Sequence, residues 1–332
     1  MANQRATATA HANIAVVKYW GVADSALTLP YNESVSMNLD HCTTTTTVAF
    51  DGSLPADEVG IAWFGREMEE VTGQAYERVV AQLDRVRMRA GIEEWARVES
   101  ANTFPADAGI ASSASAFAAL TTAAAGAAGL QLGEHELSIL TRRSGSGSAC
   151  RSIPPGFVHW RNDGTDAGSY AVSVAMPNDW ALADVVAIVD TGPKSVGSAE
   201  NHRLAVTSPY FKVRLQEVPA RVNGCLRAIR EHELATLGLI AEADAVSLHV
   251  VAMTAQPPTF YWRPGTLRVM QAVHDWRKEG FLSYWTMDAG ANVHVLCAMS
   301  DAPAVAQRLE ALPEVQFTIT NGPGPGAYLH AE

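Results

Sequence analysis

The segment from Ser112 to Gly129 constrains the fold most, because it consists almost entirely of alanine and other small residues. Alanine has the highest helix propensity, so this composition predicts a helix that ends at Gly129. A loop containing Pro105 and Gly109 precedes it, and Ser112 and Ser113 fall in the first turn. Free backbone N–H groups and the helix dipole at such a start can hold an anion, for example the phosphates of ATP. The alternative is that the two serines only cap the helix.

The residues before this helix predict a sheet on which it packs. The run Asn13–Trp20 is apolar up to its polar and aromatic end, as expected of a buried strand, and Ser34–Leu39 alternates polar and apolar residues. The β-branched run Thr43–Phe50 predicts a separate, neighbouring strand. Tyr76–Ala90 places its valines and its leucine on one helical face, and Trp95–Ser100 is a further strand candidate.

Strands and helices continue to alternate after Arg151, without a linker-like segment. Their order predicts an α+β second domain with a boundary near residue 180, and hence domains at 1–180 and 181–332. The predicted strands are 157–160, 170–175, 185–189, 281–288, 293–298 and 315–319, and the predicted helices are 209–231, 234–249 and 303–311.

Composition and charge limit the classes of function. The chain has 332 residues, 48% hydrophobic and 18% charged, so it can bury two domain cores and shows no sign of disorder. A net charge of −11 makes nucleic acids and anionic membranes poor partners, although a small anion needs only local donors. The sequence has no C-x-x-C pair, histidine cluster, secretion signal or run of roughly eighteen apolar residues. We therefore expect a reduced, cytoplasmic enzyme without a zinc site, disulfides or a membrane span.

The loop before the alanine-rich helix also carries a family pattern. Pro105–Ala114 reads P-x-x-x-G-x-A-S-S-A and resembles the phosphate loop of the GHMP kinase superfamily. Three further segments narrow the resemblance to the mevalonate diphosphate decarboxylase family, namely Ala12–Gly21, Gly145–Ser152 and Met287–Asn292. Shorter matches elsewhere extend the resemblance, in order, over nearly the whole chain.

This resemblance implies a two-domain α+β fold of the GHMP kinase type, in which a mixed α/β domain with the phosphate loop precedes a ferredoxin-like domain. It also implies a homodimeric, cytoplasmic enzyme of isoprenoid biosynthesis that uses ATP and Mg²⁺. In the family's reaction, ATP phosphorylates the 3-hydroxyl of a phosphorylated mevalonate, and that phosphate leaves as the neighbouring carboxylate is lost. Mg²⁺ neutralises charge on the transferred phosphoryl group, but the sequence does not name its protein ligand.

Three residues match the reacting end of the family's site. Arg151 matches the arginine that holds the substrate carboxylate by two charge-assisted bonds, although an arginine can also form a structural ion pair. Asp288 matches the catalytic aspartate, a general base or orienting acceptor for the 3-hydroxyl, although Asp before Ala-Gly is also a common turn residue. Lys18 ends an apolar strand, where its charge is costly without an anionic partner. We therefore expect Lys18 to pair with Asp288 and keep it ionised.

The other predicted site residues come from the same motifs. The Gly-Ser-Gly-Ser segment at 145–148 offers small hydroxyl donors to a substrate phosphate, or alternatively forms only a flexible loop. The resemblance assigns substrate binding to Tyr19, Ser146, Ser148, Arg151 and Ser198. It assigns the ATP phosphates to Pro105, Gly109, Ala111, Ser112 and Ser113.

The sequence departs from the family near the diphosphate end. Diphosphate-using members carry a second lysine where this chain has Val22, and a polar or basic residue where it has Ala199. Because both replacements remove donors, we expect mevalonate 5-phosphate as substrate and isopentenyl phosphate as product, with the 5-diphosphate as the alternative. Glu200, if it points inward, would repel a terminal phosphate, whereas His202 or Lys194 could replace the missing donors.

Three other functions remain open at this point. A mevalonate 3-kinase would stop after phosphorylation and release ADP without CO₂. Another small-molecule kinase of the superfamily, acting on homoserine or galactose, would not be expected to carry the Ala-Cys-Arg-Ser and Asp-Ala-Gly-x-Asn segments together. A regulatory protein on the same fold would bind ATP without turning over any mevalonate phosphate.

Overall fold

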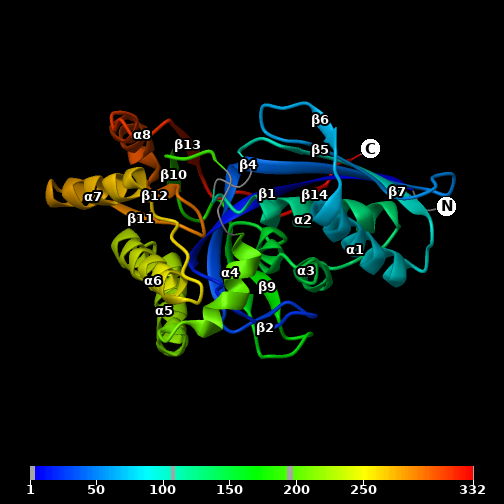
Figure 1. Cartoon of the computed structure of the whole chain (residues 1–332). Helices are drawn as coiled ribbons and strands as arrows, with labels where there is room; N and C mark the ends of the chain where they lie inside the picture. Colours follow the sequence, from blue (N-terminus) through cyan, green and yellow to red (C-terminus); the bar gives the residue numbers. More distant parts are fainter. Residues whose placement is uncertain (1–3, 106–108, 193–196, 332) are drawn as a thin grey trace.

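The computed structural model describes residues 4–105, 109–192 and 197–331, and its strands form two main sheets (Figure 1). The first sheet is eight-stranded and mixed, in the order β14-β1-β4-β7-β5-β6, with β8 pairing with β4 and β9 pairing with β8. The second is four-stranded and antiparallel, in the order β11-β12-β10-β13. Helices cover both sheets, so the predicted α+β class is confirmed.

The first sheet contains the N-terminal strands and, at one edge, the C-terminal strand. Its strands are β1 (Arg5–Val17), β4 (Ser34–Asp51), β5 (Glu58–Ala62), β6 (Met68–Glu70), β7 (Trp95–Asn102), β8 (Phe157–Arg161), β9 (Tyr170–Ala175) and β14 (Tyr328–Leu329). A separate two-stranded ladder joins β2 (Val22–Asp24) to β3 (Leu29–Pro30). The helices of this half are α1 (Gly73–Ala90), α2 (Ser112–Ala127), α3 (Glu134–Arg142) and the 3₁₀ helix η1 (Gly147–Ser152).

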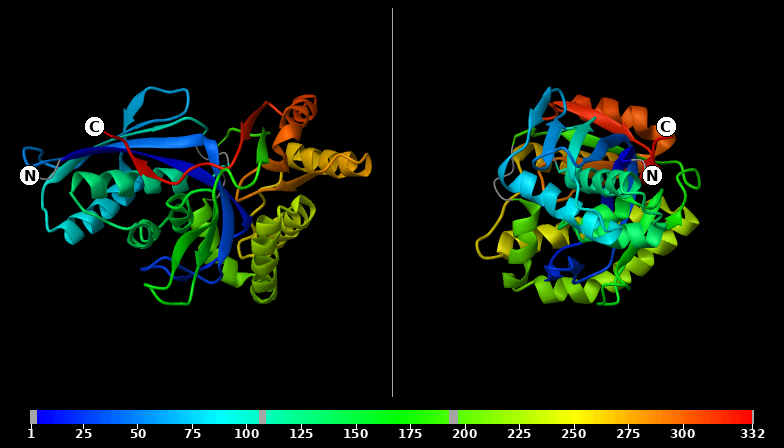
Figure 2. Two further views of the ribbon diagram at one scale, coloured as in Figure 1. Left: turned by 180° about the vertical axis from the view of Figure 1, so that it is seen from behind. Right: turned by 90° about the vertical axis from the view of Figure 1, so that its right-hand side faces the viewer.

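Helix α2 packs directly on β1 and β4, as its small side chains allow. Most of its alanines are buried, and at Gly126 an added Cβ would lie 2.8 Å from the Leu329 side chain. Small residues therefore bring the helix close to the sheet and to the C-terminal strand. Figure 2 shows both termini at the same end of the molecule, beside this sheet.

Strand β4 corrects one prediction. Ser34–Leu39 and Thr43–Phe50 were expected to be two neighbouring strands, but they form one continuous strand of 18 residues. The residues between them, Asp40–Cys42, include no glycine or proline that would make a turn, and the chain stays extended. The first part of β4 pairs with β8 and the second with β7, so one strand holds both parts of the sheet together.

The second sheet is formed by β10 (Leu182–Ile188), β11 (Ser283–Thr286), β12 (Val293–Ala298) and β13 (Phe317–Asn321). The helices of this half are α4 (Ser198–Leu204), α5 (Phe211–Glu231), α6 (Leu234–Thr254), α7 (Pro264–Lys278) and α8 (Ala302–Glu310), with the 3₁₀ helices η2 (Ala205–Thr207) and η3 (Met299–Asp301). The division into domains 1–180 and 181–332 stays a prediction, because β14 returns to the first sheet.

Helix α6 is long and apolar enough to cross a membrane by length and composition, but half of that window is buried inside the fold. It packs against α5, β1 and β11. Two of its acidic residues make ion pairs, Asp244 with Arg214 and Glu242 with Arg277. Helix α6 is therefore a core helix of this fold.

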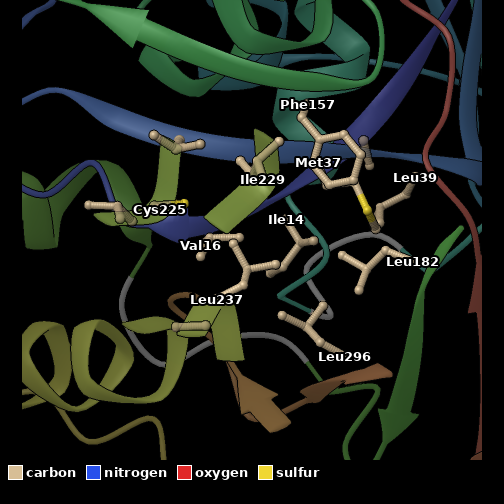
Figure 3. Close-up of a cluster of buried hydrophobic side chains, with 14 of the residues drawn as sticks. Ile14, Val16, Met37, Leu39, Phe157, Leu182, Cys225, Ile229, Leu237 and Leu296 are labelled. Carbon is tan, nitrogen blue, oxygen red and sulfur yellow. The ribbon is translucent and has the colours of Figure 1, made fainter. Parts of the chain in front are cut away.

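A single apolar cluster joins the two halves of the chain (Figure 3). Ile14 and Met37 contribute from the first sheet, Leu182 and Leu296 from the second, and Ile229 from α5. All five are buried, and the neighbouring residues of the cluster are buried as well. Because burying one aliphatic side chain contributes about 1.5–3 kcal/mol, this shared core fixes the halves relative to each other.

Candidate active site

A cavity of about 610 Å³ lies where the end of β1, the start of α2, η1, α4 and the loop after β11 meet. Its walls therefore come from both halves of the chain. Most of the predicted site residues line it, namely Lys18, Tyr19, Gly109, Ala111, Ser112, Ser113, Ser146, Ser148, Arg151, Ser198 and Asp288. Pro105 is buried and is not part of this lining. The predicted reacting end and the predicted phosphate loop thus open into one space.

Lys18 and Asp288 form an ion pair at this cavity, with 2.7 Å between Lys18 Nζ and Asp288 Oδ1. The lysine side chain is 2% exposed and also donates to the Ala15 carbonyl, whereas the aspartate side chain is 21% exposed. Burial raises the pKa of Asp288, but the charge and hydrogen bond of Lys18, with His294 and Arg151, outweigh it and hold that pKa below its usual value. Asp288 is therefore an ionised acceptor that a ligand can reach.

The backbone of Lys18 is held by residues of α5 and α6. Asp244 accepts a hydrogen bond from the Lys18 N–H at 2.7 Å, and Arg214 donates to the Lys18 carbonyl at 2.9 Å. Arg214 and Asp244 also form a buried ion pair, and Asn32 donates a second hydrogen bond to the same carbonyl. Sequence analysis missed this support, because Arg214 and Asp244 lie 196 and 226 positions away in the chain and belong to no motif.

Arg151 is a buried guanidinium whose protein partners are neutral. It donates to the side-chain oxygen of Asn13 at 3.0 and 3.2 Å and to the Ser34 hydroxyl at 2.7 Å. Within the described part of the chain it makes no ion pair, so the structural ion pair considered as its alternative role is not formed. A buried cation with only neutral partners favours an anionic ligand. Its place in the cavity wall suits the carboxylate of a substrate.

Among the described residues, no side chain caps the start of α2, so its backbone N–H groups suit anion binding. Its N-cap residue is Ala111, which adopts the left-handed region at φ 50° and has no side chain able to cap the helix. Ser112 and Ser113 are the first helical residues, so they do not act as the cap. Gly109 has φ 81°, and an added Cβ there would lie 3.2 Å from Gly290 Cα. Glycine therefore lets the phosphate loop approach the loop that carries the ionised aspartate.

The segment 145–148 is ordered, in contrast to the flexible loop considered above. Its second half belongs to η1. Ser146 Oγ donates to Ser113 Oγ at 3.1 Å, so this segment is joined directly to the start of α2. The Gly-Ser-Gly-Ser segment and the start of α2 therefore contact each other in the wall of the cavity.

The residues near the expected tail of the substrate are only partly as predicted. Val22 and Ala199 line the cavity and bring no side-chain donor to it. Glu200 does not line the cavity, and its carboxylate pairs with Arg203 on the same helix, so the condition for repelling a terminal phosphate is not met. Lys194, considered as a replacement donor, lies outside the described residues.

His202, the other replacement donor considered, is part of the cavity wall. Its ring stacks on Tyr19, with 4.1 Å between the ring centroids, and its Nδ1 accepts a hydrogen bond from the Gly21 N–H at 3.0 Å. Burial lowers the pKa of His202 to about 3, an effect that the nearby Arg151 strengthens. Burial has the opposite effect on the Tyr19 hydroxyl and raises its pKa, because in both groups it favours the neutral form. Both side chains are therefore neutral in the cavity wall near pH 7.

Among the described residues, no group of three or more His, Cys, Asp and Glu side chains could hold a metal ion by itself. Mg²⁺ bound with a nucleotide needs only one or two protein oxygens, because phosphates and waters supply the rest. The hydroxyls of Ser112 and Ser113 and the carboxylate of Asp288 line the same cavity. The residues present therefore fit a magnesium ion that arrives with a nucleotide.

Known proteins resemble this chain over both halves. Residues 10–171 match the family model of the diphosphomevalonate decarboxylase-like N-terminal domain, and residues 184–321 match the mevalonate 5-diphosphate decarboxylase C-terminal domain. Phosphomevalonate decarboxylase of Haloferax volcanii is 35% identical over 295 residues, which cover 88% of this chain and 87% of that relative. This chain belongs to the mevalonate diphosphate decarboxylase family.

Other members of the mevalonate diphosphate decarboxylase family extend the comparison. Diphosphomevalonate decarboxylase mvd1 of Aspergillus fumigatus is 34% identical over 332 residues, covering 93% of this chain and 80% of that one. The solved structure of MDDEF in complex with MVAPP, AMPPCP and magnesium is 36% identical, has a TM-score of 0.91 and covers 99% of both chains. The predicted family, its two-domain fold and its ATP-dependent decarboxylase class are confirmed.

The number of phosphates on the substrate is the point on which sequence and comparisons differ. Both family models and the Aspergillus fumigatus relative are named for the diphosphate, whereas the Haloferax volcanii relative is named for the monophosphate. The comparisons therefore favour the 5-diphosphate, the alternative given above, over the 5-phosphate. The expectation of a monophosphate rested on two lost donors, and donors from other positions in the wall can offset such a loss.

Proposed function

We propose that this chain catalyses the ATP-dependent decarboxylation of mevalonate 5-diphosphate to isopentenyl diphosphate, with release of CO₂, ADP and phosphate. One observation carries the proposal: ionised Asp288, the Arg151 guanidinium and the start of α2, which no described side chain caps, all line one cavity. An acceptor for a hydroxyl proton, a cation for a carboxylate and an anion-binding helix start are what phosphorylation followed by decarboxylation requires.

In the first step, Asp288 orients the 3-hydroxyl and accepts its proton, while the hydroxyl oxygen forms a bond to the γ-phosphorus of ATP and ADP leaves. Lys18 keeps Asp288 ionised until then. Ser112, Ser113 and the backbone N–H groups at the start of α2 hold the ATP phosphates. Magnesium bound with the nucleotide neutralises charge on the transferred phosphoryl group.

In the second step, the bond from C3 to its phosphate breaks, and phosphate leaves with the electron pair. The electrons of the bond to the carboxylate carbon form the new double bond, and CO₂ departs. Arg151 holds that carboxylate in its ionised form by charge-assisted hydrogen bonds, which the reaction requires because a protonated acid cannot release CO₂ directly. No oxidant or reductant is needed.

A second candidate substrate is mevalonate 5-phosphate, which would give isopentenyl phosphate. Val22 and Ala199 in the cavity wall favour it, because neither side chain donates to a second phosphate. The Haloferax volcanii relative, named for this activity, supports it as well.

A coupled ADP-release assay with mevalonate, its 5-phosphate and its 5-diphosphate distinguishes these substrates. We expect the highest kcat/KM with the 5-diphosphate. A higher kcat/KM with the 5-phosphate would replace the first candidate by the second. If the protein turned over none of the three compounds, both candidate functions would be contradicted. The chain would then be a nucleotide-binding protein without decarboxylase activity.

Location and assembly follow from the family resemblance. We propose a cytoplasmic homodimer that takes up a small phosphorylated substrate and neither binds nucleic acid nor enters a membrane. The negative net charge supports the absence of polyanionic partners. Sedimentation velocity on the purified chain tests the dimer, and a single species with the mass of one chain would refute it.

A further inference from the structure

The end of the cavity near Val22 contains one ring donor that the motifs do not include. His202 lies on α4 one helical turn after Ser198, and both residues line the cavity. Val22 and Ala199, also in this part of the wall, bring no donor. His202 is therefore placed where a substrate tail would need a hydrogen bond.

The backbone of Gly21 fixes the tautomer of His202. A backbone N–H can only donate, so Nδ1, which receives it at 3.0 Å, must carry the lone pair. The ring proton of the neutral imidazole then resides on Nε2. Protonation of Nδ1 would set two N–H groups against each other, and burial lowers the pKa of His202 to about 3, so the ring stays neutral.

The ring of His202 is also fixed in orientation. It stacks on Tyr19 at 4.1 Å and contacts Trp20 at 4.7 Å, both measured between ring centroids. Within the part of the chain that the structure describes, His202 Nε2 has no hydrogen-bond partner. It is not one of the unpartnered polar atoms that are fully buried, so a ligand in the cavity can reach it. The Nε2–H is therefore a positioned donor that is left for a ligand.

We propose that the Nε2–H of His202 donates a hydrogen bond to the phosphate tail of the substrate, which makes His202 a specificity-determining residue for the 5-phosphorylated substrate. This inference rests on the proposed function, since it takes a phosphorylated mevalonate as the ligand. A neutral donor beside Val22 takes the place of the lysine that the family resemblance leads one to expect there. The neutral N–H group recognises a phosphate oxygen through the direction of its hydrogen bond and not through a positive charge.

Two substitutions separate the contact to the ligand from the support of the Gly21 loop. In His202→Asn, the amide can still accept from the Gly21 N–H but has no group at the position of Nε2. In His202→Gln, the longer amide places an N–H near that position. We expect His202→Asn to raise KM for the phosphorylated mevalonate by about tenfold or more, with a much smaller change in kcat, and His202→Gln to restore most of the KM. KM for ATP should change in neither variant.

Titration calorimetry with mevalonate 5-diphosphate, and in parallel with the 5-phosphate, gives a readout independent of turnover. Weaker binding to His202→Asn than to the parent and to His202→Gln would support the inference. Equal Kd values in the parent and His202→Asn, or equal weakening in both variants, would overturn it. Tight binding to the parent without turnover would instead overturn the proposed function alone.

Discussion

Replacing Lys18 by methionine removes the cation that lies 2.7 Å from Asp288 Oδ1 and keeps a side chain of similar length. The backbone of Lys18 should stay in place, because its N–H and carbonyl are held by Asp244 and Arg214. The substitution therefore tests the charge of the pair. In the parent, that charge and its hydrogen bond outweigh the effect of burial and lower the pKa of Asp288. In the variant, Asp288 is still buried, but the ammonium that favoured its ionised form is gone, so the pKa of Asp288 rises.

The size of the effect follows from the burial of the pair. Removing one partner of a buried ion pair costs about 3–5 kcal/mol, and one pKa unit corresponds to about 1.4 kcal/mol. Because 21% of the Asp288 side chain is exposed, water relieves part of this cost, and we use the lower end of the range, about 3 kcal/mol. The acid limb of kcat/KM should then move to higher pH by about two units.

The assay is ADP release from about pH 4 to pH 8, the range that contains the shifted acid limb, for the parent, Lys18→Met and a control, Lys212→Met, which removes an exposed lysine of α5. A carboxyl group with a raised native pKa binds more protons in the native than in the unfolded state, so its contribution to stability falls as pH rises. Relative to the parent, Lys18→Met should thus lose stability as pH rises from about 4, the ordinary pKa of an unfolded aspartate, to about 6 in chemical denaturation. An acid limb at the parental pH would refute the assigned role of Lys18, and the control should match the parent.

Four further substitutions test other parts of the site. Asp288→Asn should lower kcat by roughly 10²–10⁴ with ATP affinity nearly unchanged, and near-normal turnover would contradict its role as base. Val22→Lys should raise kcat/KM for the diphosphate relative to the monophosphate by about tenfold, since a bond to a charged group contributes about 1.5–3 kcal/mol; an unchanged ratio would mean that the tail is recognised elsewhere. Gly109→Ala should raise KM for ATP, because φ is 81° and the new Cβ meets opposite backbone at 3.2 Å; an unaltered KM would show that the loop tolerates it. Asp244→Asn should lower the free energy of unfolding by about 3–5 kcal/mol, because a buried arginine loses its counter-ion, and a loss below about 1 kcal/mol would argue against this estimate.

The parts of the site that could be predicted from sequence are those set by local chemistry. Ser112 and Ser113 were placed at a helix start because alanine-rich composition defines where α2 begins. The cost of burying a lone ammonium predicted that Lys18 has an anionic partner, the family resemblance suggested Asp288 for it, and the structure places Asp288 beside Lys18. Arg151 was found through its motif, but only the structure reveals that its protein partners are neutral.

The features that sequence analysis missed depend on contacts between distant segments. Arg214 and Asp244 support Lys18 only because α5 and α6 pack beside β1. Helix α7, Pro264–Lys278, was not predicted, although a proline in its first turn is a recognised start signal. The fixed tautomer of His202 depends on the fold of the Gly21 loop, which no spacing in the sequence reveals.

The stoichiometry of CO₂ and ADP tests the central claim most directly. The enzyme is supplied with ATP, Mg²⁺ and mevalonate 5-diphosphate labelled in the carboxylate, and both products are followed from the same reaction. We predict one CO₂ for each ADP, because Asp288 and Arg151 act on one substrate in one cavity. ADP release without CO₂ would contradict this account and identify a kinase that stops at the 3-phosphate.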